Sequence, residues 1–247
     1  MFDLSLLAVL IAAFLAAGCV KGIVGFGLPT VALAGLALTT DPRTAIAMVV
    51  IPALATNIVQ ALHGPGFWRL LRRLASLIAG IVLGILIGTR LIIEIPPAII
   101  GVALGMMVAA YGAAGVYGLS FPPVGRREAW IAPPVGVAGG VVTGLTGTFL
   151  IPHTMYLASL ALTRAELVQA IGIVFTVSSL VLGIGLARVS VLTWDLAVLS
   201  TLALVPALVG MGLGRRISSR LSEHVFRRVF FWSLLGAGSA LIVRNVV

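Results

Sequence analysis

Charged residues and cysteine are both scarce in this chain of 247 residues. Only 9% of the residues are charged, whereas a soluble globular domain carries about 25%. A soluble fold of this length is excluded, because too few charges are available to cover its surface. The single cysteine, Cys19, lies in an apolar run and rules out an intramolecular disulfide bond.

Residues that carry enzyme chemistry are equally sparse. The chain has three histidines and seven acidic residues. No two histidines, cysteines or carboxylates have metal-ligand spacing on one helix. No nucleophile stands beside a base in a catalytic pattern. The sequence therefore predicts no metal, no cofactor and no enzymatic activity.

Hydrophobic residues make up 60% of the chain and gather in long continuous runs. Because lipid leaves no backbone group unpaired, only helices or closed barrels span a membrane. Barrel strands would alternate apolar and polar residues, which these runs do not. We predict an all-α integral membrane protein in contact with the lipid bilayer. The net charge of +9 comes from arginines in short loops, which does not indicate nucleic-acid binding.

Proline, glycine and charged residues divide the chain into about ten helical segments. Two are half-length, Leu28–Leu38 and His153–Leu162. The first of these would reach about 16 Å into a hydrocarbon core that is ~30 Å thick. The full segments are Leu4–Val20, Thr44–Leu62, Leu74–Ile93, Ala98–Tyr117, Ala129–Val142, Leu167–Leu186, Leu196–Leu213 and Phe226–Ile242. We expect Leu4–Val20 to be a retained helix, because it lacks a basic leader and a cleavage site.

The same order of segments recurs in both halves of the chain. We predict a first membrane repeat over 1–120, a linker over 121–128 and a second repeat over 129–247. With about five segments per half, the second repeat is inverted relative to the first, as in many secondary transporters. Arginines concentrate on one side, at Arg69, Arg72, Arg73, Arg126, Arg127, Arg164, Arg215, Arg216, Arg220, Arg227 and Arg228. This side is predicted to be cytoplasmic, so both termini of a multi-pass protein of the plasma (inner) membrane would face outward.

Glycine and proline interrupt the apolar runs at Lys21–Pro29 and again at Thr143–Pro152. Non-helical backbone at membrane depth needs protein or a water-filled cavity around it. We therefore predict that both breaks, which come from broken or re-entrant hairpins, face one cavity near the bilayer midplane. Each short helix would point free N–H groups at its centre, an arrangement that binds anions. The alternative is that the glycines only allow close helix packing.

Polar residues within the apolar segments complete the predicted anion site. Asn57 and Gln60 share one helix face, and His153 opens the second half-length segment. Hydrogen bonds between helices explain each of them equally well. The candidate ligands are Gly25, Phe26, Gly27, Leu28, Asn57, Gln60, Gly147, Thr148, Phe149, His153 and Gln169. Lys21, the only lysine, is interpreted as a cytoplasmic anchor in preference to a positive charge at the first break.

These motifs resemble the TauE/SafE family of sulfite exporters over essentially the whole chain. The resemblance rests on Gly25-Phe26-Gly27 with Pro29, on Gly140, Gly144 and Gly147 with Pro152, and on the patterns Gly84-x-x-x-Gly88-x-Arg90 and Gly210-x-x-x-Gly214-x-Arg216. It implies transport of sulfite, or of an organosulfonate such as sulfoacetate. Thr148 and Phe149 depart from the family's usual glycine cluster, which argues for a less symmetrical site.

The leading hypothesis is a transporter that moves a small inorganic or organic sulfur anion by alternating access. An anion channel is the alternative, and it would show conductance steps instead of saturation and counterflow. A membrane-embedded enzyme comes third. Export and import both stay open at this point, and the glycine faces serve either internal packing or a homodimer.

Overall fold

A computed structural model describes residues 4–64, 66–119, 122–149, 151–218 and 223–246, and these residues form an all-helical fold without a strand. The helices are α1 (Leu4–Val24), α2 (Leu28–Leu36), α3 (Pro42–Leu62), α4 (Phe67–Arg73), α5 (Ala75–Leu91), α6 (Pro97–Val116), α7 (Glu128–Thr146), α8 (His153–Ala158), α9 (Arg164–Arg188), α10 (Trp194–Leu202), α11 (Leu204–Ser218) and α12 (Glu223–Val246), with a 3-10 turn η1 (Gly125–Arg127). Arg220, Leu150 and the predicted boundary at 120–121 lie outside the described residues.

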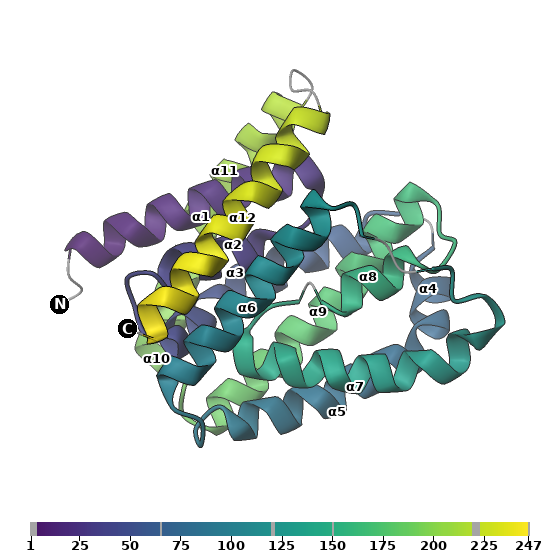
Figure 1. Cartoon of the computed structure of the whole chain (residues 1–247), viewed down its shortest axis with the longest axis horizontal. Helices are drawn as coiled ribbons and strands as arrows, with labels where there is room; N and C mark the ends of the chain where they lie inside the picture. The colour runs from purple at the N-terminus through teal and green to yellow at the C-terminus, as the bar shows by residue number, and fades with distance from the viewer. Residues whose placement is uncertain (1–3, 65, 120–121, 150, 219–222, 247) are drawn as a thin grey trace.

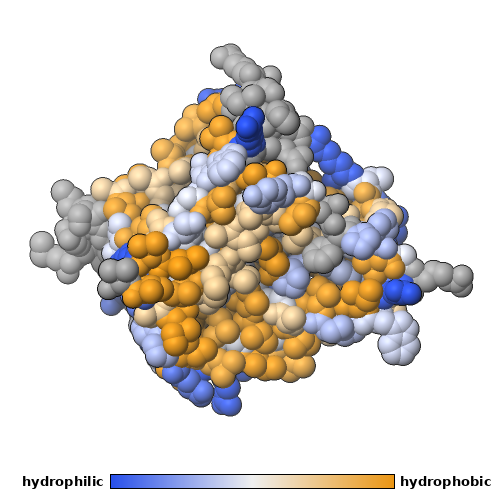
Figure 2. Space-filling model, in the orientation of Figure 1, coloured by the Kyte–Doolittle hydropathy of each residue, from blue (hydrophilic) through white to orange (hydrophobic). Residues whose placement is uncertain are grey.

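The predicted all-α membrane protein is confirmed. Seven described helices are long and apolar enough to cross a membrane, and α4 with α5 makes an eighth span if that pair, bent by 66°, is counted as one. Both half-length segments are present, as α2 and α8. Apolar surface covers most of the face shown in Figure 2, with hydrophilic residues towards its edges. Two features of the helices were not expected. α4 forms within a predicted loop, and the ninth predicted segment is divided into two helices at Ala203.

Local sequence explains where the helices begin. Asp41 caps α3 by accepting hydrogen bonds from the backbone N–H groups of Arg43 (2.9 Å) and Thr44 (3.3 Å). Thr163 and Glu166 form a capping box at the start of α9, as their spacing predicts. These contacts satisfy N–H groups that have no partner in the first turn of a helix.

Glycine faces bring two pairs of helices into very close contact. A Cβ atom at Gly84 of α5 would lie 2.2 Å from the carbonyl oxygen of Val137 in α7, and one at Gly214 of α11 would lie 2.1 Å from that of Cys19 in α1. Backbones can approach this closely only where side chains are absent. The glycine pairs Gly84/Gly88 and Gly210/Gly214 therefore serve internal packing, one of the two roles that the sequence left open.

The register of these contacts sets the direction of each pair. Along α5, Gly80 faces Gly136 and Gly88 faces Gly144, so α5 and α7 run in the same direction. Gly18 of α1 lies against Ala207 of α11 and Gly22 lies against Gly214, so α1 and α11 also run in the same direction. By contrast, α3 packs antiparallel to α9, and α6 antiparallel to α12. The start of α1 and the end of α12 lie at the left of Figure 1, and α4 lies at the opposite end.

Two glutamine side chains bridge α3 and α9. The Gln60 amide donates to the carbonyl of Val168 at 2.8 Å. The Gln169 amide nitrogen donates to the carbonyls of Ala61 (3.0 Å) and Gly64 (2.9 Å), and its oxygen accepts from the Gly66 N–H at 3.0 Å. Gln169 therefore closes the turn between α3 and α4 from the neighbouring helix.

Gln169→Ala should lower the free energy of unfolding by about 1–3 kcal/mol, because it leaves buried backbone groups without partners. Thermal unfolding of purified protein in detergent measures the change. Ser239→Ala is the matched control, since this exposed hydroxyl bonds only to the Leu235 carbonyl of its own helix. Equal unfolding temperatures for both variants would contradict the bridging role.

Candidate functional site

The first break adopts the backbone that its glycines allow. Gly25 and Gly27 have φ angles of 90° and 98°, in the left-handed region that residues with a Cβ rarely adopt. α1 ends at Val24, and α2 begins at Leu28 with a proline in its first turn. Within the described ranges, no backbone carbonyl accepts a hydrogen bond from the N–H of Phe26 or Gly27. Phe26 is half-buried, whereas Leu28 is fully buried.

Lys21, one turn before this break, is buried in the helix bundle. Only 4% of its surface is exposed. Its ammonium nitrogen donates to the hydroxyl of Thr56 at 3.0 Å and to the side-chain oxygen of Asn57, both on α3. The interpretation of Lys21 as a cytoplasmic anchor is wrong, because an anchor would extend its amine to the interface. Its place in an apolar run, immediately before a glycine-rich break, was the feature of the sequence that indicated burial.

Asn57 is the predicted ligand that lies beside this lysine. Its oxygen accepts from Lys21, while its amide nitrogen is buried without a hydrogen-bond partner. Such a donor is rare in a folded protein and points to a group that completes the site. Gln60 and Gln169 do not join this cluster, because their amides bind backbone carbonyls between α3 and α9. Their role as ligands stays a prediction.

The second break is closed by threonines instead. α7 ends at Thr146 and is capped by Gly147, whose φ angle is 67°. The Thr143 hydroxyl donates to the carbonyl of Thr148 at 2.8 Å, and the hydroxyls of Thr146 and Thr148 lie 2.8 Å apart. Phe149 packs on Phe175 of α9, with ring centroids 5.4 Å apart. The polar groups of this break are thus largely satisfied by one another.

Glycines of the two breaks lie against different elements. Gly147 lies against the side chains of Leu33 in α2 and Ile46 in α3, whereas Gly27 lies against Phe230 of α12 and Val20 of α1. The second break therefore contacts the short helix of the first half. That both breaks line one cavity stays a prediction.

His153 begins α8 and is completely buried. Neither ring nitrogen has a hydrogen-bond partner, although the carbonyls of Gly136 and Phe149 lie near the ring. It fits only because α7 has a glycine opposite, since a Cβ atom at Gly139 would lie 2.3 Å from Nε2. α8 has six residues and α2 has nine, so fewer aligned peptide dipoles point at the second break.

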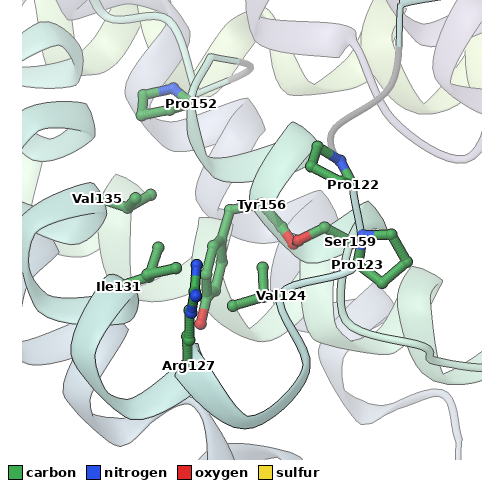
Figure 3. Close-up of a pocket in the computed structure, with 9 residues that line it drawn as sticks. All are labelled: Pro122, Pro123, Val124, Arg127, Ile131, Val135, Pro152, Tyr156 and Ser159. Carbon is green, nitrogen blue, oxygen red and sulfur yellow. The ribbon is translucent and has the colours of Figure 1, made fainter.

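A pocket of about 530 Å³ lies between α7, α8 and the preceding linker, but it does not match a small oxyanion (Figure 3). Its lining is Pro122, Pro123, Val124, Arg127, Ile131, Val135, Pro152, Tyr156 and Ser159. None of these is a predicted ligand. Arg127, the one charged residue in the lining, is exposed to the outside. The buried cluster of Lys21, Thr56 and Asn57, hereafter the lysine cluster, is the better candidate for an anion.

The model of the sulfite exporter TauE/SafE family matches residues 10–241. The chain belongs to the TauE/SafE family. The match includes both breaks and the lysine cluster, and the family is one of sulfite exporters and sulfur-anion permeases. Neither the curated proteins nor the solved structures compared with the chain gave a match.

Family membership supports a role in membrane transport for this multi-pass protein. A transporter family also agrees with the prediction that the chain is not an enzyme. Among the described residues, no group of three His, Cys, Asp or Glu side chains could hold a metal ion. The identity of the anion and the residues that bind it belong to the proposal that follows.

Proposed function

We propose that this TauE/SafE protein carries a small sulfur-containing oxyanion across the plasma membrane by alternating access. Sulfite, or an organosulfonate such as sulfoacetate, is the substrate. Family membership supports the sulfur chemistry. The observation that carries the proposal is Lys21, the single lysine, which is buried in a membrane-spanning helix.

Lys21 lacks an opposite charge in the described part of the chain. Its two hydrogen-bond partners are neutral, and the described ion pairs, Arg69 with Glu166 and Arg73 with Glu128, lie at the bundle surface. A buried charge without a partner is strongly unfavourable and marks a functional site inside a membrane protein. A bound anion would supply the missing charge.

Neutral donors around the first break suit the oxygens of such an anion. The free amide nitrogen of Asn57 lies beside the lysine. Thr30, in the first turn of α2, is buried with its hydroxyl unpartnered. The N–H groups of Phe26 and Gly27 add backbone donors where α2 begins. We assign anion binding to these groups and to Lys21, with Leu28 and Gly25 shaping the break.

The second break would form the opposite gate. We assign Gly147, Thr148, Phe149 and His153 to it, because they follow α7 as the first break follows α1. Its contact with α2 and α3 through Gly147 supports a coupled movement of the two breaks. Gln60 and Gln169 would fix α3 against α9 while these breaks move.

Two inverted repeats, 1–120 and 129–247, fit the way the helices pair. α1 packs on α11 of the other half, and α7 packs in the same manner on α5. The self-pairs α3 with α9 and α6 with α12 are antiparallel, as a two-fold axis within the membrane plane requires. With α4 and the arginine-rich loops on the cytoplasmic side, both termini would face outward.

Stabilisation by ligands provides the first test. Sulfite, thiosulfate or methanesulfonate should raise the unfolding temperature of purified protein by roughly 5 °C at concentrations far above Kd. Tetramethylammonium and sucrose should not. If tetramethylammonium or sucrose stabilised the protein and none of the sulfur anions did, the proposal would be wrong.

Flux into proteoliposomes then separates a carrier from a channel. A carrier should show saturable sulfite uptake and counterflow. Conductance steps in planar bilayers, with uptake that does not saturate, would favour the anion channel instead.

A further inference from the structure

The number of hydrogen-bond acceptors around Lys21 matches a neutral amine. Thr56 uses its own hydroxyl proton on the carbonyl of Pro52 at 2.7 Å, so its oxygen accepts from Lys21. Asn57 provides the second acceptor. A neutral amine has two N–H groups, whereas an ammonium has three. The described acceptors thus satisfy the neutral form and leave the third proton of the charged form for a ligand.

No described carboxylate lies on the helices around this lysine. On α1 the other titratable side chain is Cys19, and α2 carries none. α3 has Arg43, but only in its first turn. α11 carries Arg215 and Arg216, and both are exposed. An empty site therefore contains nothing that would hold a proton on Lys21 against the penalty of burying a charge.

In the proposed repeat, the positions of the second half that match this cluster carry no charge. The residues 122 positions after Lys21, Thr56 and Asn57 are Thr143, Ser178 and Ser179. All three are buried, and their hydroxyls donate to backbone carbonyls at 2.7–2.8 Å. The protein thus places one titratable cation in one repeat and neutral, satisfied groups at the matching positions of the other.

We propose that Lys21 carries the coupled proton, so that each anion crosses the membrane together with one H⁺. This inference rests on the proposed transport function. When the anion binds, the lone pair of the Lys21 amine takes a proton from a hydronium ion, which leaves a water molecule, and the resulting ammonium pairs with the anion. On release at the other side, the N–H bond breaks and the proton returns to water. The empty carrier then reorients with a neutral amine.

Proton movement during sulfite uptake tests this coupling. Proteoliposomes with a trapped pH dye are given sulfite at mildly acidic pH, where sulfite is mainly a monoanion, and uptake by protein-free vesicles is subtracted. We expect one proton to enter with each sulfite, and the rate to be insensitive to an imposed membrane potential. Protein-dependent sulfite uptake without proton entry would overturn the coupling and leave the transport function intact. Absence of protein-dependent uptake would end both.

Lys21→Arg separates binding from proton release. Arginine keeps its proton at any relevant pH, so the variant should still exchange internal for external sulfite. Net uptake should be about a hundredfold lower, because the empty carrier must reorient with an unpaired charge. If the ratio of net uptake to exchange were the same in the variant as in the wild type, the proposal would be contradicted.

His153→Gln provides the comparison, since His153 is the other buried basic side chain among the described residues. The proton-to-sulfite ratio of this variant should stay at one whatever its rate. A ratio of zero would assign the proton to His153 and overturn the proposal.

If Lys21→Arg does not fold, the single lysine offers a direct readout on the native chain. Protein labelled with isotopic lysine should give one side-chain nitrogen signal in NMR. We expect the chemical shift of a neutral amine without sulfite and that of an ammonium at saturating sulfite. The same shift in both states would overturn the proposal.

Discussion

Lys21→Gln should reduce sulfite affinity by about a hundredfold or more, the usual effect of removing one partner from a buried charge pair. Glutamine keeps a donor near Thr56 and Asn57 but cannot carry a positive charge. The loss should appear as an absent thermal shift with sulfite and as an absence of saturable uptake. Arg215→Gln is the matched control, because it removes an exposed cation from the helix that packs against α1.

The stability of the anion-free variant separates a binding role from a structural one. If Lys21 serves the substrate, the native chain bears the free-energy cost of taking its amine out of water. Lys21→Gln removes this cost and should unfold at the same temperature as the native chain or higher. If Lys21 mainly holds α1 to α3, the variant should unfold earlier. A lower unfolding temperature with sulfite stabilisation retained would contradict the proposed role.

Gly84→Leu should destabilise the fold by about 3 kcal/mol or more, since side chains forced into a filled interface strain the surrounding backbone. A Cβ atom at Gly84 would meet the Val137 oxygen at 2.2 Å and the Val141 nitrogen at 2.8 Å. Both are backbone atoms of α7, so no side chain can rotate away. We expect early thermal unfolding and poor recovery of monodisperse protein in size-exclusion chromatography.

Glycines without neighbours provide the control for this interface. No atom lies within 4 Å of a Cβ position at Gly212 of α11 or Gly236 of α12. Gly212→Ala should leave stability unchanged or raise it by up to about 1 kcal/mol, because alanine favours the helix. If Gly84→Ala behaved like Gly212→Ala, close contact between α5 and α7 would not support the fold.

The lysine cluster contains few polar groups. One amine, one amide and one hydroxyl lie together in a helix bundle whose buried residues are mostly apolar. In such surroundings a single charge dominates the local electrostatics, because the effective dielectric is low. A proton carried on that amine would let the same group bind the anion and then release it.

Composition and local pattern were enough to determine the class of protein and most of its helices. Sixty per cent hydrophobic residues leave only a membrane interior as solvent, and backbone pairing in lipid then requires helices. The half-length segments and the glycine faces could be predicted because proline, glycine and helical spacing act over a few residues. The division at Ala203 and the bend between α4 and α5 at Leu74 could not, because no glycine or proline stands at either position.

Only the tertiary structure decided which polar residues belong together. Asn57 and Gln60 lie three positions apart on one helix, yet Asn57 contacts Lys21 and Gln60 contacts Val168 of α9. From the sequence alone, Lys21 was interpreted as an anchor, because a lysine beside a predicted loop usually reaches the interface. Its burial depends on Thr56 and Asn57, 35 and 36 positions away. Helical periodicity predicts which face a residue occupies, but the packing of distant helices determines what that face meets.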